Sequence, residues 1–343
     1  RWKRKLAFYM GEDIRKNNLY NLIATYLVLN KWEIPGFDEF KGIDFRKIEE
    51  RLDLKIDNPA VEHSVPDWLY ELVQKNYPKQ VDEIFTALNE QAQVYIRVNT
   101  LKTTTEDLIT ALATDGVEVE RIEGRDDALV LVERKNVFRT NAFQDGWFEV
   151  QDLSSQLVAE ALDPQPGTRV FDVCAGAGGK TLHIASLMQN KGQIIALDLY
   201  EWKLKELKRR AKRAGAHNIE TRPIIAKTIK RLKDSADALL IDAPCSGLGV
   251  LKRNPDAKWK LDAAFIERIT KEQEEILQNH SKVLRKGGKM VYATCSILPE
   301  ENEQQVEKFL ANNPEFSLVK QETLLPNKTG NDGFFIAVLE RKV

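Results

Sequence analysis

The spacing of hydrophobic residues changes along the chain and separates regions of different expected structure. In the first region, apolar side chains recur at helical spacing, as in the stripe that starts at Leu19 and ends before Ile34-Pro35-Gly36. The helical pattern resumes after Ser64-Val65-Pro66-Asp67 and continues to residue 92. We therefore expect an N-terminal helical region, residues 1–62, that covers part of the remaining protein, followed by a linking helix.

Alternation of apolar and polar residues follows and predicts a small α+β unit. Strands are expected at residues 94–98, 117–122 and 128–132, and a helix at residues 105–113. The helix ends at Asp115-Gly116, a typical stop signal. Together with the linking helix, this unit makes a predicted second domain of residues 63–150.

Strands and helices alternate from residue 151 onward, which predicts a doubly wound, mostly parallel α/β sheet. The expected strands are residues 168–173, 193–198, 223–226, 238–242 and 289–293, with helices at 180–189, 201–214 and 264–284. A last pair of strands, 316–319 and 334–339, has no helix between them and predicts an antiparallel hairpin at one edge. We expect residues 151–343 to form one α/β domain whose ligands bind at the carboxyl ends of the strands.

A glycine-rich loop follows the first of these strands, and three kinds of ligand could explain it. A phosphate-binding loop needs glycine five residues before Gly179-Lys180, where this chain has Cys174. A dinucleotide loop needs a third glycine, which is absent after Gly176 and Gly178. S-adenosylmethionine needs a tight glycine turn and an acid at the end of the second strand for the ribose hydroxyls. We favour this third alternative.

Asp198 is the acid at the end of the second strand, 22 residues after Gly176. It could also cap the helix that starts near Glu201, and the two roles are compatible. The residues expected to contact the cofactor are Cys174, Ala175, Gly176, Ala177, Gly178, Gly179, Lys180, Asp198, Asp242 and Pro244.

Each of the three cysteines follows a predicted strand. Cys174 is expected to be a small buried side chain, whereas Cys245 and Cys295 each precede a serine in a polar turn and should reach the cleft. A thiolate that adds to carbon 6 of a pyrimidine activates carbon 5 toward a methyl donor, and a second thiol can assist release. Asp242 would stabilise the adduct, and Lys180 completes the set of candidate catalytic residues.

Short motifs around these residues resemble the Sun/RsmB-type RNA cytosine-C5 methyltransferases. The matching stretches are Arg97-Val98-Asn99-Thr100, Val150-Gln151-Asp152-Leu153-Ser154-Ser155, Cys174–Lys180, Asp242–Gly247, Thr294-Cys295-Ser296 and Asp332-Gly333-Phe334-Phe335. The resemblance implies a small RRM-like domain before a Rossmann-like class I methyltransferase domain. It also implies that Cys295 is the nucleophile, that Cys245 promotes product release, and that the substrate is RNA, with 16S ribosomal RNA favoured.

The chain departs from the family pattern at two places. The family loop commonly has Ala-Pro where this sequence has Gly176-Ala177, which is a mild change. More seriously, an acid that usually follows the third strand and contacts adenine is missing from Ile225-Ala226-Lys227-Thr228. We therefore expect adenine recognition to come from other groups.

The distribution of charge adds an expected RNA-binding stretch. The net charge is −1, from 51 Lys and Arg against 52 Asp and Glu, which excludes a globally basic protein. Basic residues nevertheless concentrate between positions 201 and 260. Those nearest the proposed cleft are Lys252, Arg253, Lys258 and Lys260, and we predict that they contact RNA phosphates. The run from Lys208 to Arg213 is more typical of a solvated helix face.

Other features limit the classes of function. The four histidines have no metal-ligand spacing, and three scattered cysteines make no disulfide framework. No apolar run approaches the roughly 18 residues of a membrane span. We expect a cytoplasmic, monomeric enzyme without a metal. A non-catalytic RNA-binding protein on the same fold and a small-molecule methyltransferase remain as alternatives.

Overall fold

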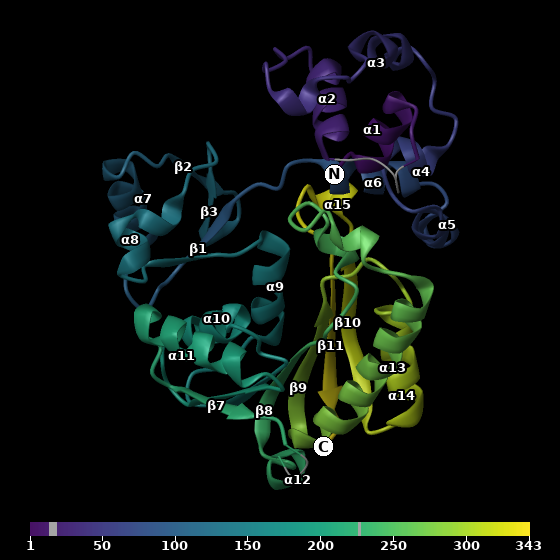
Figure 1. The fold of residues 1–343 in the computed structure, drawn as a ribbon. Helices are drawn as coiled ribbons and strands as arrows, with labels where there is room; N and C mark the ends of the chain where they lie inside the picture. The colour runs from purple at the N-terminus through teal and green to yellow at the C-terminus, as the bar shows by residue number, and fades with distance from the viewer. Residues whose placement is uncertain (14–18, 226–227) are drawn as a thin grey trace.

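The computed structural model describes residues 1–13, 19–225 and 228–343, and Figure 1 shows three regions in the order that the sequence predicts. Helices gather at the N-terminal end, a small α+β unit follows, and a large α/β unit completes the chain. The first helices are α1 (Lys3–Met10), α2 (Leu19–Leu29), α3 (Phe45–Leu52), α4 (Pro59–Glu62), α5 (Asp67–Asn76) and α6 (Val81–Asn89).

Helices α4 to α6 pack against the large unit, although the small unit follows them directly in the sequence. Leu69 and Ile84 share a hydrophobic cluster with Leu248, Ile297 and Leu325. Arg4 of α1 adds an ion pair to Asp67, at 2.7 Å, so the N-terminal region is attached to the same helices. The expected helical cover over residues 1–62 therefore lies next to α6 and the C-terminal part of the chain (Figure 1).

The small unit has a four-stranded antiparallel sheet. Its elements are β1 (Tyr95–Val98), α7 (Thr105–Thr114), β2 (Val119–Ile122), β3 (Arg125–Leu131), α8 (Asn141–Gln144) and β4 (Phe148–Val150), and the strand order is β2-β3-β1-β4. The three predicted strands are present. The alternation pattern missed β4 because three residues are too few to show a period.

The large unit has a seven-stranded sheet of order β10-β11-β9-β8-β5-β6-β7. The strands are β5 (Arg169–Val173), β6 (Gln193–Asp198), β7 (Ile219–Pro223), β8 (Ala236–Asp242), β9 (Leu284–Thr294), β10 (Phe316–Leu324) and β11 (Phe334–Arg341). Strands β7, β6, β5, β8 and β9 pair in parallel, and β11 and β10 add an antiparallel hairpin at the β9 edge. The predicted Rossmann-like sheet with its edge hairpin is confirmed.

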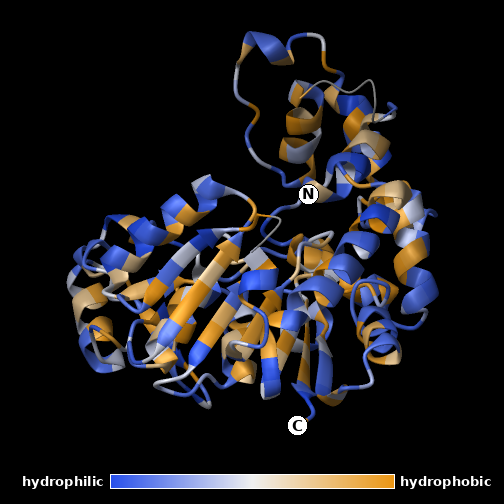
Figure 2. Ribbon diagram, turned by 90° about the horizontal axis from the view of Figure 1, so that it is seen from below, coloured by the Kyte–Doolittle hydropathy of each residue, from blue (hydrophilic) through white to orange (hydrophobic). Residues whose placement is uncertain are grey.

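Helices cover both faces of this sheet, and its inner strands are accordingly hydrophobic along most of their length (Figure 2). One face carries α9 (Leu153–Leu162), α10 (Gly179–Leu187) and α11 (Glu201–Ala214), and the other carries α13 (Ala263–His280) and α14 (Glu303–Asn312). Two short helices, α12 (Thr228–Arg231) and α15 (Pro326–Thr329), lie in connections. Among the described residues, no helix is both long enough and apolar enough to cross a membrane.

Three elements differ clearly from their expected boundaries. The third strand lies at Ile219–Pro223 rather than at residues 223–226, because β7 is an edge strand with half-buried polar residues, and the apolar Pro-Ile-Ile run follows it. Residue 226, the expected end of that strand, lies outside the described residues. The helix expected at 264–284 ends at His280, and β9 begins at Leu284, ahead of the expected residue 289.

Candidate active site

The glycine-rich loop turns sharply between β5 and α10. Cys174, Gly176 and Gly178 all have positive φ, at 64°, 55° and 87°. A Cβ atom on Gly178 would lie 2.5 Å from Cγ of Leu207 in α11, so only glycine fits there. The loop is therefore a tight turn pressed against α11.

Asp198 lies at the end of β6 and is fixed against this loop. Its Oδ2 accepts a hydrogen bond from the Gly176 backbone N–H at 2.9 Å, and its Oδ1 accepts one from the Tyr200 N–H at 2.8 Å. The side chain does not bond to the first turn of α11, whose N-cap residue is Tyr200. Asp198 therefore does not cap this helix, which was the alternative role that the sequence offered. Each carboxylate oxygen retains a further lone pair for a ligand hydroxyl.

A cavity of about 330 Å³ opens beside the loop and Asp198. It is lined by Cys174, Asp198, Leu199, Tyr200, Lys203, Ile224, Asp242, Pro244, Glu272, Ile276 and His280. Its walls combine apolar side chains with carboxylates. Apolar walls suit a flat base, and the carboxylates suit hydroxyl and cationic groups, so the residues present fit a nucleoside with a positive charge.

Lys180 and Asp242 form a half-buried ion pair at the edge of this cavity, with 2.7 Å between Nζ and Oδ2. Burial by itself would lower the pKa of Lys180, but the carboxylate of Asp242 outweighs it and raises the pKa above its ordinary value. Lys180 therefore remains a cation at neutral pH, and its ammonium donates a hydrogen bond to Asp242.

The structure brings Cys245 and Cys295 together, with 3.3 Å between their Sγ atoms. They reach this position because β8 and β9 are adjacent and parallel, so the turns after both strands lie at one edge of the sheet. The hydrogen bond to Cys295 and burial raise the pKa of the Cys245 thiol well above its ordinary value. Cys245 thus keeps its proton and can donate it toward the sulfur of Cys295.

Cys174 lies apart from this pair, within the cofactor cavity. Burial raises the pKa of its thiol above the ordinary range, and the negative charge of Asp242 is the second largest cause of the rise. A thiol that stays protonated is a poor nucleophile. The side chain of Cys174 is half-buried, as are those of Cys245 and Cys295, and not fully buried as the sequence predicted.

Comparison with known proteins decides the family. Residues 159–340 match the family model described as 16S rRNA methyltransferase RsmB/F, and residues 65–138 match the ferredoxin-like domain of RsmF/B-like methyltransferases. The chain belongs to the RsmB/F methyltransferase family. A Bacillus subtilis relative, named probable ribosomal RNA small subunit methyltransferase B, is 34% identical over 98% of this chain and 78% of its own length. A Serratia proteamaculans relative, named ribosomal RNA small subunit methyltransferase B, is 36% identical over 94% of this chain and 76% of its own.

Solved structures agree with this assignment. The crystal structure of PH0851 is 31% identical, covers 98% of this chain and 80% of its own, and has a TM-score of 0.80. NSun6 from Pyrococcus horikoshii, solved with SFG, is 25% identical, covers 80% of this chain and 98% of its own, and has a TM-score of 0.75. SFG is an analogue of S-adenosylmethionine. The RsmB/F protein described here is an S-adenosylmethionine-dependent methyltransferase with a Rossmann-like fold, as its motifs predict.

One residue that sequence reasoning missed supports both cysteine turns of this RsmB/F protein. Glu301 is fully buried and accepts hydrogen bonds from the Ser246 N–H at 2.7 Å, the Ser246 hydroxyl at 2.5 Å and the Ser296 hydroxyl at 2.5 Å. The serines that follow the two cysteines are therefore joined by one carboxylate. The repeated Cys-Ser pair was a signal for such a partner, but it does not distinguish Glu301 from the neighbouring Glu300 and Glu303.

The prediction that Lys252 and Lys258 contact RNA phosphates requires correction, because both side chains are buried. Only 4% of Lys252 is exposed, and its Nζ donates to the Gly330 carbonyl at 2.6 Å. Only 1% of Lys258 is exposed, and its Nζ lies 3.3 Å from Oδ1 of Asn89. Both ammonium groups therefore donate hydrogen bonds within the protein, and these bonds hold the segment from Lys252 to Lys258 in place.

Arg253 and Lys260 also have partners within the protein. Arg253 bridges two buried carboxylates, at 2.9 Å from Asp152 and 2.5 Å from Asp332. Lys260 is exposed and pairs with Asp256 at 2.5 Å. Of the four predicted RNA contacts, Lys260 is the side chain that can reach a phosphate with little rearrangement. The stretch without an adenine-contacting acid is Ile225-Ala226-Lys227-Thr228, and two of its residues, 226 and 227, lie outside the described residues. Ile224, directly before this stretch, lines the cavity.

Proposed function

We propose that this protein methylates carbon 5 of a cytosine in 16S ribosomal RNA through a covalent bond between Cys295 and carbon 6. The observation that carries the proposal is the pair of thiols 3.3 Å apart, adjacent in the fold to the Lys180–Asp242 pair at the cofactor cavity. The names of the relatives support small-subunit ribosomal RNA as the substrate. The order of the small sheet, β2-β3-β1-β4, agrees with an RRM-like domain that binds RNA.

In this mechanism the Cys295 thiolate adds to carbon 6, and the electrons of the carbon 5–carbon 6 double bond move into the ring. Asp242 was expected to stabilise the adduct itself. Because Asp242 accepts a hydrogen bond from the Lys180 ammonium, we assign the donor role toward the ring to that ammonium, and Asp242 orients it. Bound S-adenosylmethionine supplies an electrophilic methyl group, which carbon 5 takes.

The second thiol acts when the product leaves. A general base takes the proton from carbon 5, and the electrons of that C–H bond restore the carbon 5–carbon 6 double bond. The bond between Cys295 and carbon 6 breaks at the same time, and its electron pair returns to sulfur. The protonated Cys245 thiol donates a hydrogen bond to that sulfur and stabilises the departing thiolate. The two cysteines thus act at opposite ends of the reaction.

Substituting the cysteines separately tests these roles. Cys295→Ala should give neither methylated RNA nor a covalent complex. Cys245→Ala should still attach and methylate the RNA but release it slowly, so a protein–RNA band should survive denaturing electrophoresis. The double variant should behave like Cys295→Ala, because release is irrelevant without attachment.

Two other outcomes would refute the assignment. An adduct trapped in Cys295→Ala and absent from Cys245→Ala would make Cys245 the nucleophile. Methylation that persists in both variants would exclude a covalent mechanism.

Bisulfite sequencing of ribosomal RNA from cells with and without the gene identifies the modified cytosine, and an unchanged 16S pattern would exclude that substrate.

A further inference from the structure

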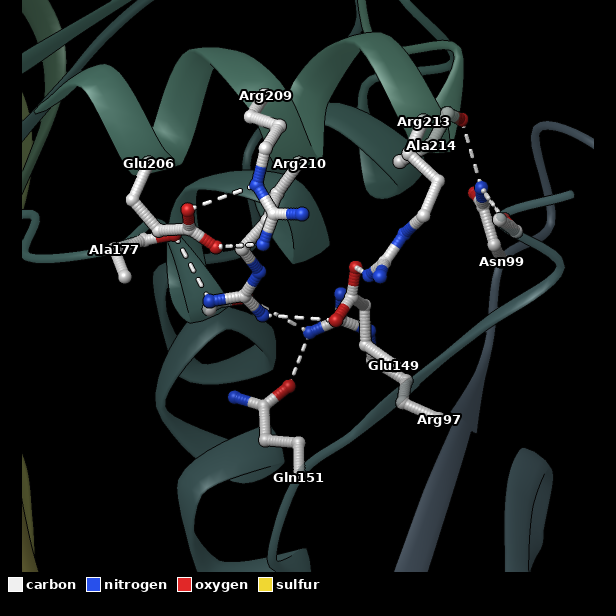
Figure 3. Close-up of polar contacts among 12 residues, drawn as sticks. Arg97, Asn99, Glu149, Gln151, Ala177, Glu206, Arg209, Arg210, Arg213 and Ala214 are labelled. Atoms are coloured by element: carbon white, nitrogen blue, oxygen red, sulfur yellow. Dashed lines mark hydrogen bonds and ion pairs between the residues drawn. The ribbon is translucent and has the colours of Figure 1, made fainter. Parts of the chain in front are cut away.

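Two motifs of the chain lie away from the thiols and have no part in the reaction proposed above. Arg97 and Val98 belong to β1 of the small domain and Asn99 directly follows it, while Gln151 directly follows β4, where the small domain joins the methyltransferase domain. Arg97 and Glu149 are direct partners across the β1–β4 pair. Figure 3 shows that their side chains meet α11 and the glycine-rich loop of the methyltransferase domain.

Two arginines bind backbone carbonyls of that loop. Arg210 of α11 donates from Nη1 to the Ala177 carbonyl at 2.9 Å, and Arg97 donates from Nη1 to the Gly179 carbonyl at 3.0 Å. The N–H of Gly176, in the same loop, bonds to Asp198. The loop is therefore held by Asp198 through an N–H group and by the two arginines through carbonyl groups.

Glu149 joins Arg210 to a third arginine, Arg213. Its Oε2 accepts from Nη2 of Arg210 at 2.8 Å, and its Oε1 accepts from Arg213. Arg97 also donates to Gln151 (Figure 3). Glu149 is only 5% exposed, so the arginines have a buried counter-charge that makes their geometry costly to change.

Close backbone packing makes the same contact rigid. A Cβ atom on Gly146 would lie 2.1 Å from the Arg213 carbonyl oxygen, so the turn before β4 touches the end of α11 directly. Nδ2 of Asn99 donates to the Gly146 carbonyl at 2.7 Å and to the Ala214 carbonyl at 2.8 Å. Helix α11 is thus enclosed between the small domain and the glycine-rich loop.

We propose that the small domain completes the cofactor site, and that Arg97, Glu149 and Arg210 are positioning residues that hold the glycine-rich loop in its cofactor-binding conformation. None of these three side chains lines the cavity. They act through the backbone of Ala177 and Gly179. Without them, part of the binding free energy of S-adenosylmethionine would be spent on ordering the loop.

The test compares two neighbouring arginines of α11. Arg210→Gln removes the donor to Ala177. The matched control, Arg209→Gln, removes an arginine that is 74% exposed and that, among the described residues, pairs with Glu206. The affinity for S-adenosylmethionine is measured by calorimetry without RNA, which makes the result independent of the proposed cytosine chemistry. We expect Arg210→Gln to bind about tenfold more weakly than the control, the effect of losing one charge-assisted hydrogen bond.

Steady-state kinetics separates positioning from a general structural defect. Arg210→Gln should raise KM for S-adenosylmethionine by about tenfold and leave kcat at saturating cofactor close to that of the Arg209→Gln control. Arg210→Lys should recover part of the affinity, since one ammonium can reach Ala177 or Glu149 but not hold both as a guanidinium does.

The proposal fails if Arg210→Gln binds S-adenosylmethionine as tightly as Arg209→Gln does. A fall in RNA affinity with unchanged cofactor affinity would likewise overturn it and make Arg210 an RNA contact. If Arg210→Gln does not fold, Glu149→Gln decides the question by the same calorimetric criterion, because it keeps both arginines but removes the charge that orients Arg210.

Discussion

The stability of this protein should depend on pH through Asp172, two residues before Cys174. The side chain is 1% exposed, and its Oδ2 accepts a hydrogen bond from the Thr181 hydroxyl at 2.5 Å. Within the part of the chain that the structure describes, Oδ1 has no hydrogen-bond partner. Burial raises the pKa of this carboxyl from 3.8 to about 7, since the charged form has lost its water.

The sign of the effect follows from proton binding. Because the pKa is higher in the folded state, the folded protein binds a proton between pH 4 and pH 7 that the unfolded chain has released. The stability contribution of Asp172 is therefore fully present below its unfolded pKa and is lost as pH rises through about 7. The whole change is about 4 kcal/mol as an upper figure, and about 2–3 kcal/mol of it falls between pH 5 and pH 8.

Asp172→Asn isolates this contribution. The amide is neutral at every pH and its oxygen can still accept from Thr181, so the variant should gain stability relative to the wild type as pH rises. Urea unfolding at pH 5 and pH 8 measures the two free energies of unfolding. Asp57→Asn, at a side chain that is 89% exposed, is the control and should show no such trend. An Asp172→Asn effect of equal size at both pH values would refute the reasoning.

Three further substitutions test other parts of the site. Asp198→Ala should weaken S-adenosylmethionine binding by about 1.5–3 kcal/mol while leaving RNA affinity nearly unchanged, and an unaltered calorimetric affinity would contradict the ribose role. Arg253→Gln should lower the free energy of unfolding by about 3 kcal/mol, more at pH 8 than at pH 5, because it leaves Asp152 and Asp332 as buried like charges. If it instead keeps its stability and loses RNA affinity, Arg253 is a phosphate contact after all. Glu301→Gln should cost about 2 kcal/mol in urea unfolding and slow methylation, because both carboxyl oxygens accept hydrogen bonds and an amide has only one acceptor oxygen. Full activity with unchanged stability would show that the two turns do not depend on it.

The sequence alone determined the fold class and the edge of the sheet where the site lies. Alternation of strands and helices is a local property, so the parallel sheet and the terminal hairpin could be predicted before any contact was known. Once the strands are parallel, the residues that follow them must share one edge. This is why Asp198, Cys245 and Cys295 were found from their positions after strands. The roles of the two thiols remain predictions.

Only the tertiary structure decided which charged side chains face solvent and which serve as internal partners. Lys252 and Lys258 have the same local pattern as a solvated basic stretch, but residues distant in the sequence, Gly330 and Asn89, enclose their ammonium groups. The contacts of Arg97 with the glycine-rich loop and of Glu149 with α11 likewise join residues from two domains. A charge can be buried only where other groups replace its hydrating water, and these groups can come from distant parts of the sequence. The local spacing of residues therefore does not predict which charges are buried.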